Sequence, residues 1–179
     1  MITTSRRPTR AIRTFCRDLS HTIPGTLRIN RGKLSLEGLV EKALEFNADK
    51  LVIVDRWRGG PGKIQFFVRG IGLQPVPPLI YLRRVKLRRD FPKVMPKGKR
   101  IRSVAIADAQ SASAEAEKLK SAFSKFFSIP IISYGAIEGY DAVMQIIREH
   151  DFLTVTFKLV PEMVEIGPHM RISHLIWEV

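Results

Sequence analysis

The order of strand and helix signals restarts once along the chain, and this repetition constrains the fold more than any other feature of the sequence. Residues 2–69 predict strand, helix, strand, helix, strand and strand, and the same order resumes after Arg102. The offset between the two patterns is nearly constant, so that Ile2 corresponds to Val104. We therefore predict an α/β fold of two similar β-α-β-α-β-β halves related by a pseudo-twofold duplication.

Apolar spacing predicts the elements of the first half. Strands are expected over residues 2–5, 26–29 and 64–69, and the continuous apolar run at 51–54 is typical of a strand buried on both faces. A second helix is expected to begin after Ser35, which is a good N-cap. The first helix is marked by five apolar residues at helical spacing: Ile12, Phe15, Cys16, Leu19 and Ile23.

The second half gives similar signals, and the segment between the halves differs from both. Strands are expected over 104–107, 129–133 and 152–159, with one or two more through 164–166 and 172–177, and helices near 116–127 and 140–147. Five prolines interrupt the intervening segment. We predict a single domain over 1–179, made of an N-terminal half 1–70, a basic crossover 71–101 and a C-terminal half 102–179.

The positive charge of the chain is segregated. Thirty Lys and Arg against 17 Asp and Glu give a formal net charge of +13. Residues 1–33 hold eight basic residues against Asp18, and residues 83–102 hold ten against Asp90, whereas residues 103–179 hold six basic against ten acidic residues. Such concentration favours a nucleic acid as partner, because phosphate contacts require clustered cations.

The first helix and the two basic segments supply the candidate contacts. Arg10, Arg13 and Arg17 are expected on the helix face opposite the apolar residues. Trp57, which lies between two arginines, is a further candidate for contact with a base. The predicted RNA-binding residues are Ser5, Arg6, Arg7, Arg10, Arg13, Arg17, Arg28, Arg31, Lys33, Arg83, Arg84, Lys86, Arg88, Arg89, Lys99 and Arg100.

Other classes of protein find little support in the sequence. One cysteine excludes a disulfide framework and a multi-thiolate zinc site, and Cys16 is expected to be a core thiol. Without a long apolar run or a signal peptide, we expect a soluble cytoplasmic protein with no membrane contact. The glycine-rich segment 59–63 fails as a phosphate-binding loop, since Trp57 stands at its first glycine position and Ile64 follows the lysine. No catalytic residue, metal or cofactor is predicted.

Both ends of the chain resemble the Brix domain of ribosome-biogenesis proteins. Residues 2–6, followed by Pro8 and an arginine-rich helix, resemble its opening, and residues 165–172 resemble its closing segment. The resemblance spans essentially the whole chain, and the chain is similar to the minimal archaeal, single-domain members of the family. Two departures stand out: His169 occupies a position where the family usually has arginine, and the central Gly-Pro-Thr segment of the family is not recognisable.

This resemblance implies both a fold and a function. It implies two halves that each resemble the anticodon-binding domain of class II aminoacyl-tRNA synthetases, and a protein that binds precursor ribosomal RNA and assists its processing and subunit assembly without catalysis. Ser5 and Arg6 fall at the N-terminal signature, and Gly167 and Pro168 at the C-terminal one, where they are expected to shape the last strand. Other ribosome assembly proteins are the implied partners. Two alternatives remain open: an RNA-acting enzyme, such as a nuclease or a modification enzyme, and a protein-interaction module docking through the acidic second half.

Overall fold

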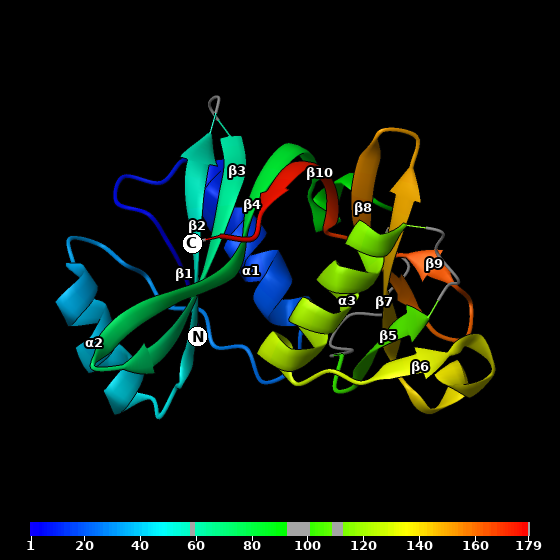
Figure 1. The fold of residues 1–179 in the computed structure, drawn as a ribbon, viewed down its shortest axis with the longest axis horizontal. Helices are drawn as coiled ribbons and strands as arrows, with labels where there is room; N and C mark the ends of the chain where they lie inside the picture. Colours follow the sequence, from blue (N-terminus) through cyan, green and yellow to red (C-terminus); the bar gives the residue numbers. More distant parts are fainter. Residues whose placement is uncertain (58–59, 93–100, 109–112, 179) are drawn as a thin grey trace.

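A ten-stranded sheet joins both halves of the chain in the computed structural model, which describes residues 1–57, 60–92, 101–108 and 113–178. The strands lie in the order β1-β2-β3-β4-β10-β8-β7-β5-β6, and β9 pairs with β8. β1, β2 and β3 come from the predicted N-terminal half, β4 from the predicted crossover and the others from the predicted C-terminal half (Figure 1). β4 therefore connects the two halves, because it pairs with β3 on one side and with β10 on the other.

The first half forms most of the elements that its sequence predicts. They are β1 (Ile2–Thr4), α1 (Arg10–Thr22), α2 (Leu36–Glu45), β2 (Lys50–Trp57) and β3 (Gly60–Gly70). The crossover adds β4 (Gly72–Lys86) and the short helix η1 (Arg88–Asp90). β1 is parallel to β2, and β2, β3 and β4 are successively antiparallel. The strand expected at 26–29 is reduced to one parallel bridge between Arg28 and Ile2.

The second half contains one element of a type that the sequence did not predict. Its elements are β5 (Val104–Asp108), α3 (Ala114–Phe127), β6 (Ile131–Ser133), η2 (Tyr134–Gly139), β7 (Ala142–Glu149), β8 (Phe152–Leu159), β9 (Val164–Glu165) and β10 (His169–Ile176). The helix expected at 140–147 is wrong, because this segment is strand β7. Met144 packs into the main core and Val143 into a separate cluster on the opposite face. A strand buried on both faces has no apolar alternation, so its pattern can be mistaken for that of a buried helix.

The proline-rich segment is a strand rather than an irregular connection over its first part. Pro75 of β4 pairs with Phe67 of β3, Pro77 and Pro78 lie in the register shift between Val76 and Ile80, and the pairing of β4 with β10 begins only at Leu79. Proline is tolerated there because a strand with one neighbour leaves half of its backbone N–H groups outside the ladder. The division of the chain at residues 70 and 102 stays a prediction.

One core cluster holds both halves together. α1 and α3 both pack into it, whereas α2 and η2 pack against two smaller clusters on the other face of the sheet. On β2, Val52 and Val54 enter the main core while Leu51 and Ile53 face α2, which confirms a strand buried on both sides. In Figure 1 the strand β4 rises from beside α2 at the lower left to the upper centre, where it lies next to β10 with α1 and α3 below.

Candidate nucleic-acid interface

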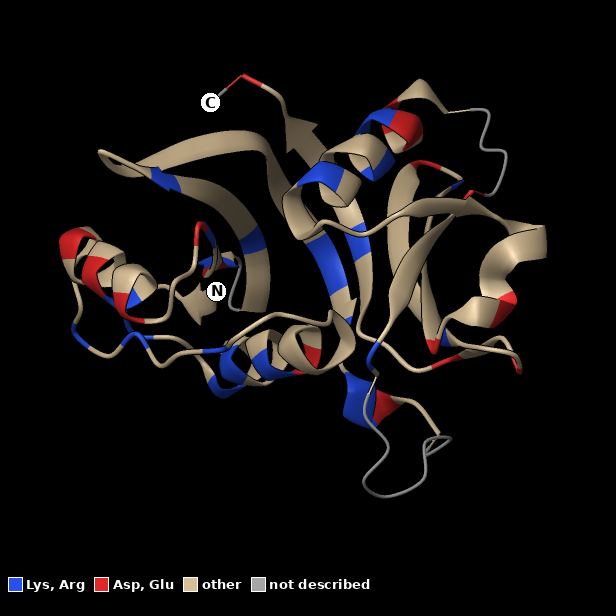
Figure 2. Cartoon of the chain, turned by 90° about the horizontal axis from the view of Figure 1, so that it is seen from below, with Lys and Arg blue, Asp and Glu red and all other residues tan. Residues whose placement is uncertain are grey.

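The arginines of α1 lie on its solvent face, as its sequence predicts. The hydroxyl of Thr9 caps the helix by accepting a hydrogen bond from the N–H of Ile12 at 3.3 Å. The apolar residues of α1 are buried in the main core, and Arg10, Arg13 and Arg17 are exposed. Figure 2 shows these basic positions along one edge of the molecule. The helix thus anchors itself through one face and presents three guanidinium groups on the other.

Further cations gather in the loops around α1. The Nε atoms of Arg6 and Arg31 both approach the carbonyl oxygen of Leu34, at 3.5 and 3.2 Å. Burial lowers the pKa of the Arg31 guanidinium, and the positive charge of Arg6 lowers it further. Two like charges are therefore held near each other, and the negative charge of Asp55 partly offsets the lowering of the Arg31 pKa. Arg7 and Lys33 are exposed, Ser5 and Arg28 are half-buried, and Arg28 donates to Asn30 at 2.5 Å.

A buried carboxylate joins the two basic segments of the chain. Asp18, 5% exposed, accepts a hydrogen bond from the backbone N–H of Arg88 at 2.9 Å. Burial raises the pKa of Asp18, and the hydrogen bond from Arg88 and the charge of Arg17 oppose that rise. The contact places η1, with Arg88 and the exposed Arg89, against the arginine-bearing helix. A lone acidic residue in a basic stretch was the only sequence signal for this junction.

A register shift turns two consecutive arginines of β4 toward solvent. Where β4 pairs with β10, Arg83 is an additional residue between two regular pairs. Leu82 is therefore buried and Val85 packs on the same core, while Arg83 and Arg84 are both exposed. We use the name outer face for the side of β4 and β10 that is turned away from this core. Bulges commonly re-aim side chains in this way.

The paired strand β10 carries a matching shift. Ser173 is its additional residue, and its hydroxyl donates to the carbonyl oxygen of Tyr81 at 3.0 Å. Ile172 and Leu175 pack into the core, so Ser173 and His174 are both exposed on the outer face. The two shifts together place four polar side chains at the seam between the halves.

Two residues of this face were missed by sequence reasoning. Arg171 lies directly opposite Arg84, and His169 lies opposite Lys86. With Glu149 these residues line a hollow of about 330 Å³. Alternation along β10 could have placed Arg171 outside the core, but the pairing of β10 with β4 carries no signal in a single sequence. Lys99 and Arg100, two of the predicted contacts, lie outside the described residues.

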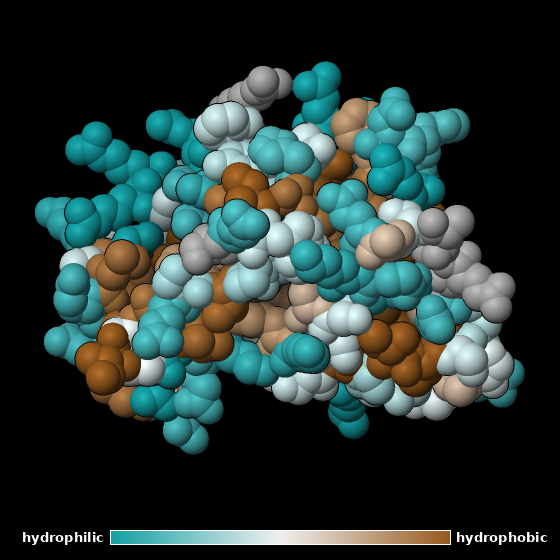
Figure 3. Space-filling view, in the orientation of Figure 1, coloured by the Kyte–Doolittle hydropathy of each residue, from teal (hydrophilic) through white to brown (hydrophobic). Residues whose placement is uncertain are grey.

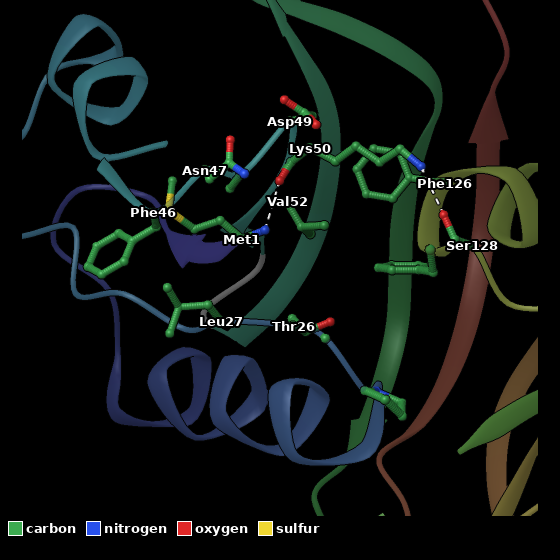
Figure 4. A pocket seen from close by; sticks show the side chains of 14 residues that line it. Met1, Thr26, Leu27, Phe46, Asn47, Asp49, Lys50, Val52, Phe126 and Ser128 are labelled. Atoms are coloured by element: carbon green, nitrogen blue, oxygen red, sulfur yellow. Dashed lines mark hydrogen bonds between the residues drawn. The ribbon is translucent and has the colours of Figure 1, made fainter. Parts of the chain in front are cut away.

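A second hollow, of about 380 Å³, lies between the first half and the end of α3 (Figure 4). The amino group of Met1 donates to the carbonyl oxygen of Lys50 at 2.8 Å, and the Lys50 ammonium donates to the hydroxyl of Ser128 at 3.4 Å. Lys50 also donates to the carbonyl oxygen of Lys125 at 2.8 Å. Through these contacts Lys50 bridges the first half and the end of α3.

Several other features bear on chemistry. Burial raises the pKa of the Cys16 thiol to about 12, so the thiol stays protonated in the core as expected. Among the described residues, no group of three or more His, Cys, Asp and Glu is arranged to hold a metal ion. No helix in the described part of the chain is long and apolar enough to cross a membrane. The Nδ1 atom of His169 lies 2.6 Å from a carboxylate oxygen of Glu165.

Known structures share this fold. The crystal structure of a probable ribosomal biogenesis protein from Aeropyrum pernix K1 superposes with a TM-score of 0.75 at 28% identity, covering 96% of this chain and 93% of that chain. The crystal structure of Mil, an archaeal Imp4-like protein, superposes with a TM-score of 0.68, covering 99% of both chains. At 19% identity the second likeness shows the fold alone.

Matches to curated sequences identify a family for this chain, although no family model matches it. A stretch of 66 residues is 48% identical to a probable Brix domain-containing ribosomal biogenesis protein of Aeropyrum pernix, but it spans only 37% of that relative. The match to the similarly described protein of Pyrococcus horikoshii, 37% identical, spans 41% of it. The protein of that description from Pyrobaculum aerophilum is 30% identical over 155 residues, which cover 86% of this chain and 82% of that one. The chain therefore belongs to the family of Brix domain-containing ribosomal biogenesis proteins.

Proposed function

We propose that this protein binds precursor ribosomal RNA and assists subunit assembly without a catalytic step of its own. The observation that carries the proposal is the contact between Asp18 and the backbone of Arg88, which joins two separate basic segments. Arginine suits this role because its planar guanidinium can donate two parallel hydrogen bonds to a phosphate. Contacts of this kind position an RNA rather than read its bases.

The second half supports a different role within the same proposal. Residues 103–179 carry an excess of acidic residues, which would repel RNA and suit an assembly protein with a basic surface. Ile131, Tyr134 and Ile176 are exposed large apolar side chains of this half that add to the surface available for a protein partner, and Figure 3 shows apolar colour over part of it. We assign RNA binding chiefly to the first half and the crossover.

The proposal also includes the origin of the fold. In each half the first strand is parallel to a later strand, β1 to β2 and β5 to β7, and an antiparallel strand follows, β3 or β8. This agreement supports a duplicated unit related by pseudo-twofold symmetry. The resemblance of each unit to the anticodon-binding domain of class II aminoacyl-tRNA synthetases rests on the family resemblance.

Charge reversal on α1 tests the proposed RNA contact. In Arg10→Glu/Arg13→Glu/Arg17→Glu we expect affinity for a ribosomal RNA fragment to fall sharply, and the slope of log K against log salt to lose roughly 0.7–0.9 for each contact removed. The fold should persist because all three side chains are exposed. Filter binding over a series of salt concentrations measures both quantities.

A matched variant separates a local contact from general attraction. Lys118→Glu/Lys125→Glu/Arg148→Glu changes the net charge equally, but at exposed positions of the second half. We expect it to bind RNA nearly as well as the wild type. Equal losses in both variants would reduce the α1 contact to non-specific electrostatics, and unchanged binding in the α1 variant would contradict the proposal. Cleavage of labelled RNA in the presence of Mg²⁺ would instead support the enzymatic alternative.

A further inference from the structure

A third hollow on the outer face is lined by residues at the ends of β2 and β3 and by residues of the paired strands β4 and β10. Figure 1 shows where these strands lie. Its volume is about 380 Å³. Both register shifts described above open onto it, because each of the four side chains that they turn outward lines it. The lining residues are Trp57, Gly60, Pro61, Leu82, Arg83, Arg84, Val85, Ser173 and His174.

The aromatic side chains at this hollow are fixed in place and only partly covered. Trp57 is 45% exposed, and its ring meets that of Tyr81 edge-on with centroids 5.2 Å apart. The ring of His174 stacks on that of Tyr81, with centroids 4.4 Å apart and an interplanar angle of 14°. Tyr81 thus acts as a support that orients two exposed rings. Preorganised rings of this kind lose little conformational freedom when a third ring stacks on them.

The charge around these rings is positive. Arg83 and Arg84 both line the hollow, and its lining includes no Asp or Glu among the described residues. Arg84 also lies opposite Arg171, and the two line the neighbouring hollow together with Glu149. The ammonium of Lys63 lies 6.0 Å from the Tyr81 ring centroid. A flat aromatic surface beside clustered cations fits a group that is itself flat and joined to an anion.

We propose that this hollow binds one unpaired nucleotide of an RNA strand, with its base stacked against Trp57 and His174 and its phosphates held by Arg83 and Arg84. The inference rests on the proposed RNA binding. It adds a preference for unpaired nucleotides, which phosphate contacts by the arginines of α1 would not provide. A base within an A-form duplex has both faces covered, so only an unpaired base can enter. Stacking accepts any base, so the site selects single-stranded RNA rather than a sequence.

Tryptophan fluorescence reports on this site directly. The chain has two tryptophans, so Trp177→Phe leaves Trp57 as the single tryptophan. We expect single-stranded oligoadenylate of 12 nucleotides to quench the emission of this variant, and an RNA duplex of equal length to leave it nearly unchanged. Circular dichroism of the variant checks that its fold is retained. Equal quenching by both probes, or by neither while oligoadenylate binds, would overturn the proposal.

Substitution of Trp57 separates stacking from charge. In Trp57→Ala we expect affinity for the oligoadenylate to fall about tenfold while affinity for the duplex stays unchanged, and Trp57→Phe should retain most of the binding because it keeps an aromatic ring. If Trp57→Ala binds both probes as tightly as the wild type, the nucleotide site is wrong and the proposed function stands. Equal losses for both probes would also refute a site for unpaired bases. If the wild type binds neither probe nor a ribosomal RNA fragment, the proposed function itself fails.

Discussion

The helices α1 and α3 hold comparable places in the two halves but differ in the charge of their first turns. Each follows a strand that is parallel to a neighbour, each begins at a hydroxyl cap, Thr9 or Ser113, and both pack into the same core. α1 has no acidic residue in its first turn and exposes three arginines, whereas the first turn of α3 carries Glu115 and Glu117. The core therefore fixes where a helix lies, while its solvent face stays free to acquire a function.

The buried charged residues of the two helices also differ in sign. α1 buries Asp18, which accepts a hydrogen bond from the basic segment at η1. α3 buries Lys120, whose ammonium lies 3.2 Å from the carboxylate of Asp108 and 2.7 Å from that of Glu117. Each half thus uses one buried charge to organise groups of opposite sign around its helix. The first half gathers cations and the second gathers carboxylates.

The largest effect is expected from the buried charge of α3. Lys120→Ala should lower the free energy of unfolding by about 3 kcal/mol, because it removes a fully buried side chain and leaves two carboxylates without their shared cation. Lys120→Met keeps the volume and should cost less than about 1.5 kcal/mol. Urea denaturation measures both. Equal losses would show that the ion pairs, rather than the packing, hold α3 in place.

The buried charge of α1 is expected to matter less for stability and more for the link to η1. Asp18→Ala removes the acceptor of the Arg88 N–H and should cost about 1–2 kcal/mol, whereas Asp18→Asn retains an acceptor oxygen and should cost less. Hydrogen exchange at the Arg88 amide should accelerate in the alanine variant. Slow exchange in both variants would separate η1 from α1 and weaken the idea of one basic surface.

The same carboxylate predicts a pH dependence. Burial raises the pKa of Asp18 above its ordinary value of 3.8, so the folded protein holds this proton more tightly than the unfolded chain does. The associated stability is complete below pH 3.8 and is lost as the pH rises through the raised pKa. Relative to Asp18→Asn, the unfolding free energy of the wild type should therefore decrease between about pH 3.5 and pH 7. A constant difference across that range would contradict a raised pKa.

The smallest effect is expected when a single exposed cation is removed from each helix in turn. Arg13→Ala should reduce the salt slope of RNA binding by roughly 0.7–0.9, the contribution of one phosphate contact. Lys118→Ala, on α3, should leave the slope unchanged, since its ammonium lies 4.2 Å from the Trp177 ring centroid in the acidic half. Both substitutions remove one exposed positive charge. Identical slopes for the two variants would erase the distinction between the helices.

Local sequence patterns predicted α1, the start of α2 and β2. The buried and exposed faces of α1 followed from helical spacing, the cap at Ser35 from its residue type, and β2 from a short continuous apolar run. Sequence reasoning failed at β7, where burial on both faces removed the alternation that separates strand from helix. It also did not predict that β4 continues through its prolines, because a single sequence does not show that Pro75 has one strand partner or that a register shift accommodates Pro77 and Pro78.

The candidate surface was predictable in composition but not in arrangement. Clustered arginines were visible in the sequence, yet the junction at Asp18 and the partnership of Arg84 with Arg171 depend on contacts between segments far apart in the chain. The register shifts at Arg83 and Ser173 arise only when β4 and β10 pair. A single sequence carries no record of which strands become neighbours.

The core that the two halves share determines how the molecule unfolds. Phe66 of β3 packs its ring against those of Phe123, Phe126 and Phe127 of α3, at centroid distances of 5.8, 4.8 and 6.1 Å. Melting either half would expose this aromatic cluster to water, so neither half gains by unfolding alone. The chain is built to lose its structure in one cooperative transition, and whatever RNA binds to the first half also protects the second half from denaturation.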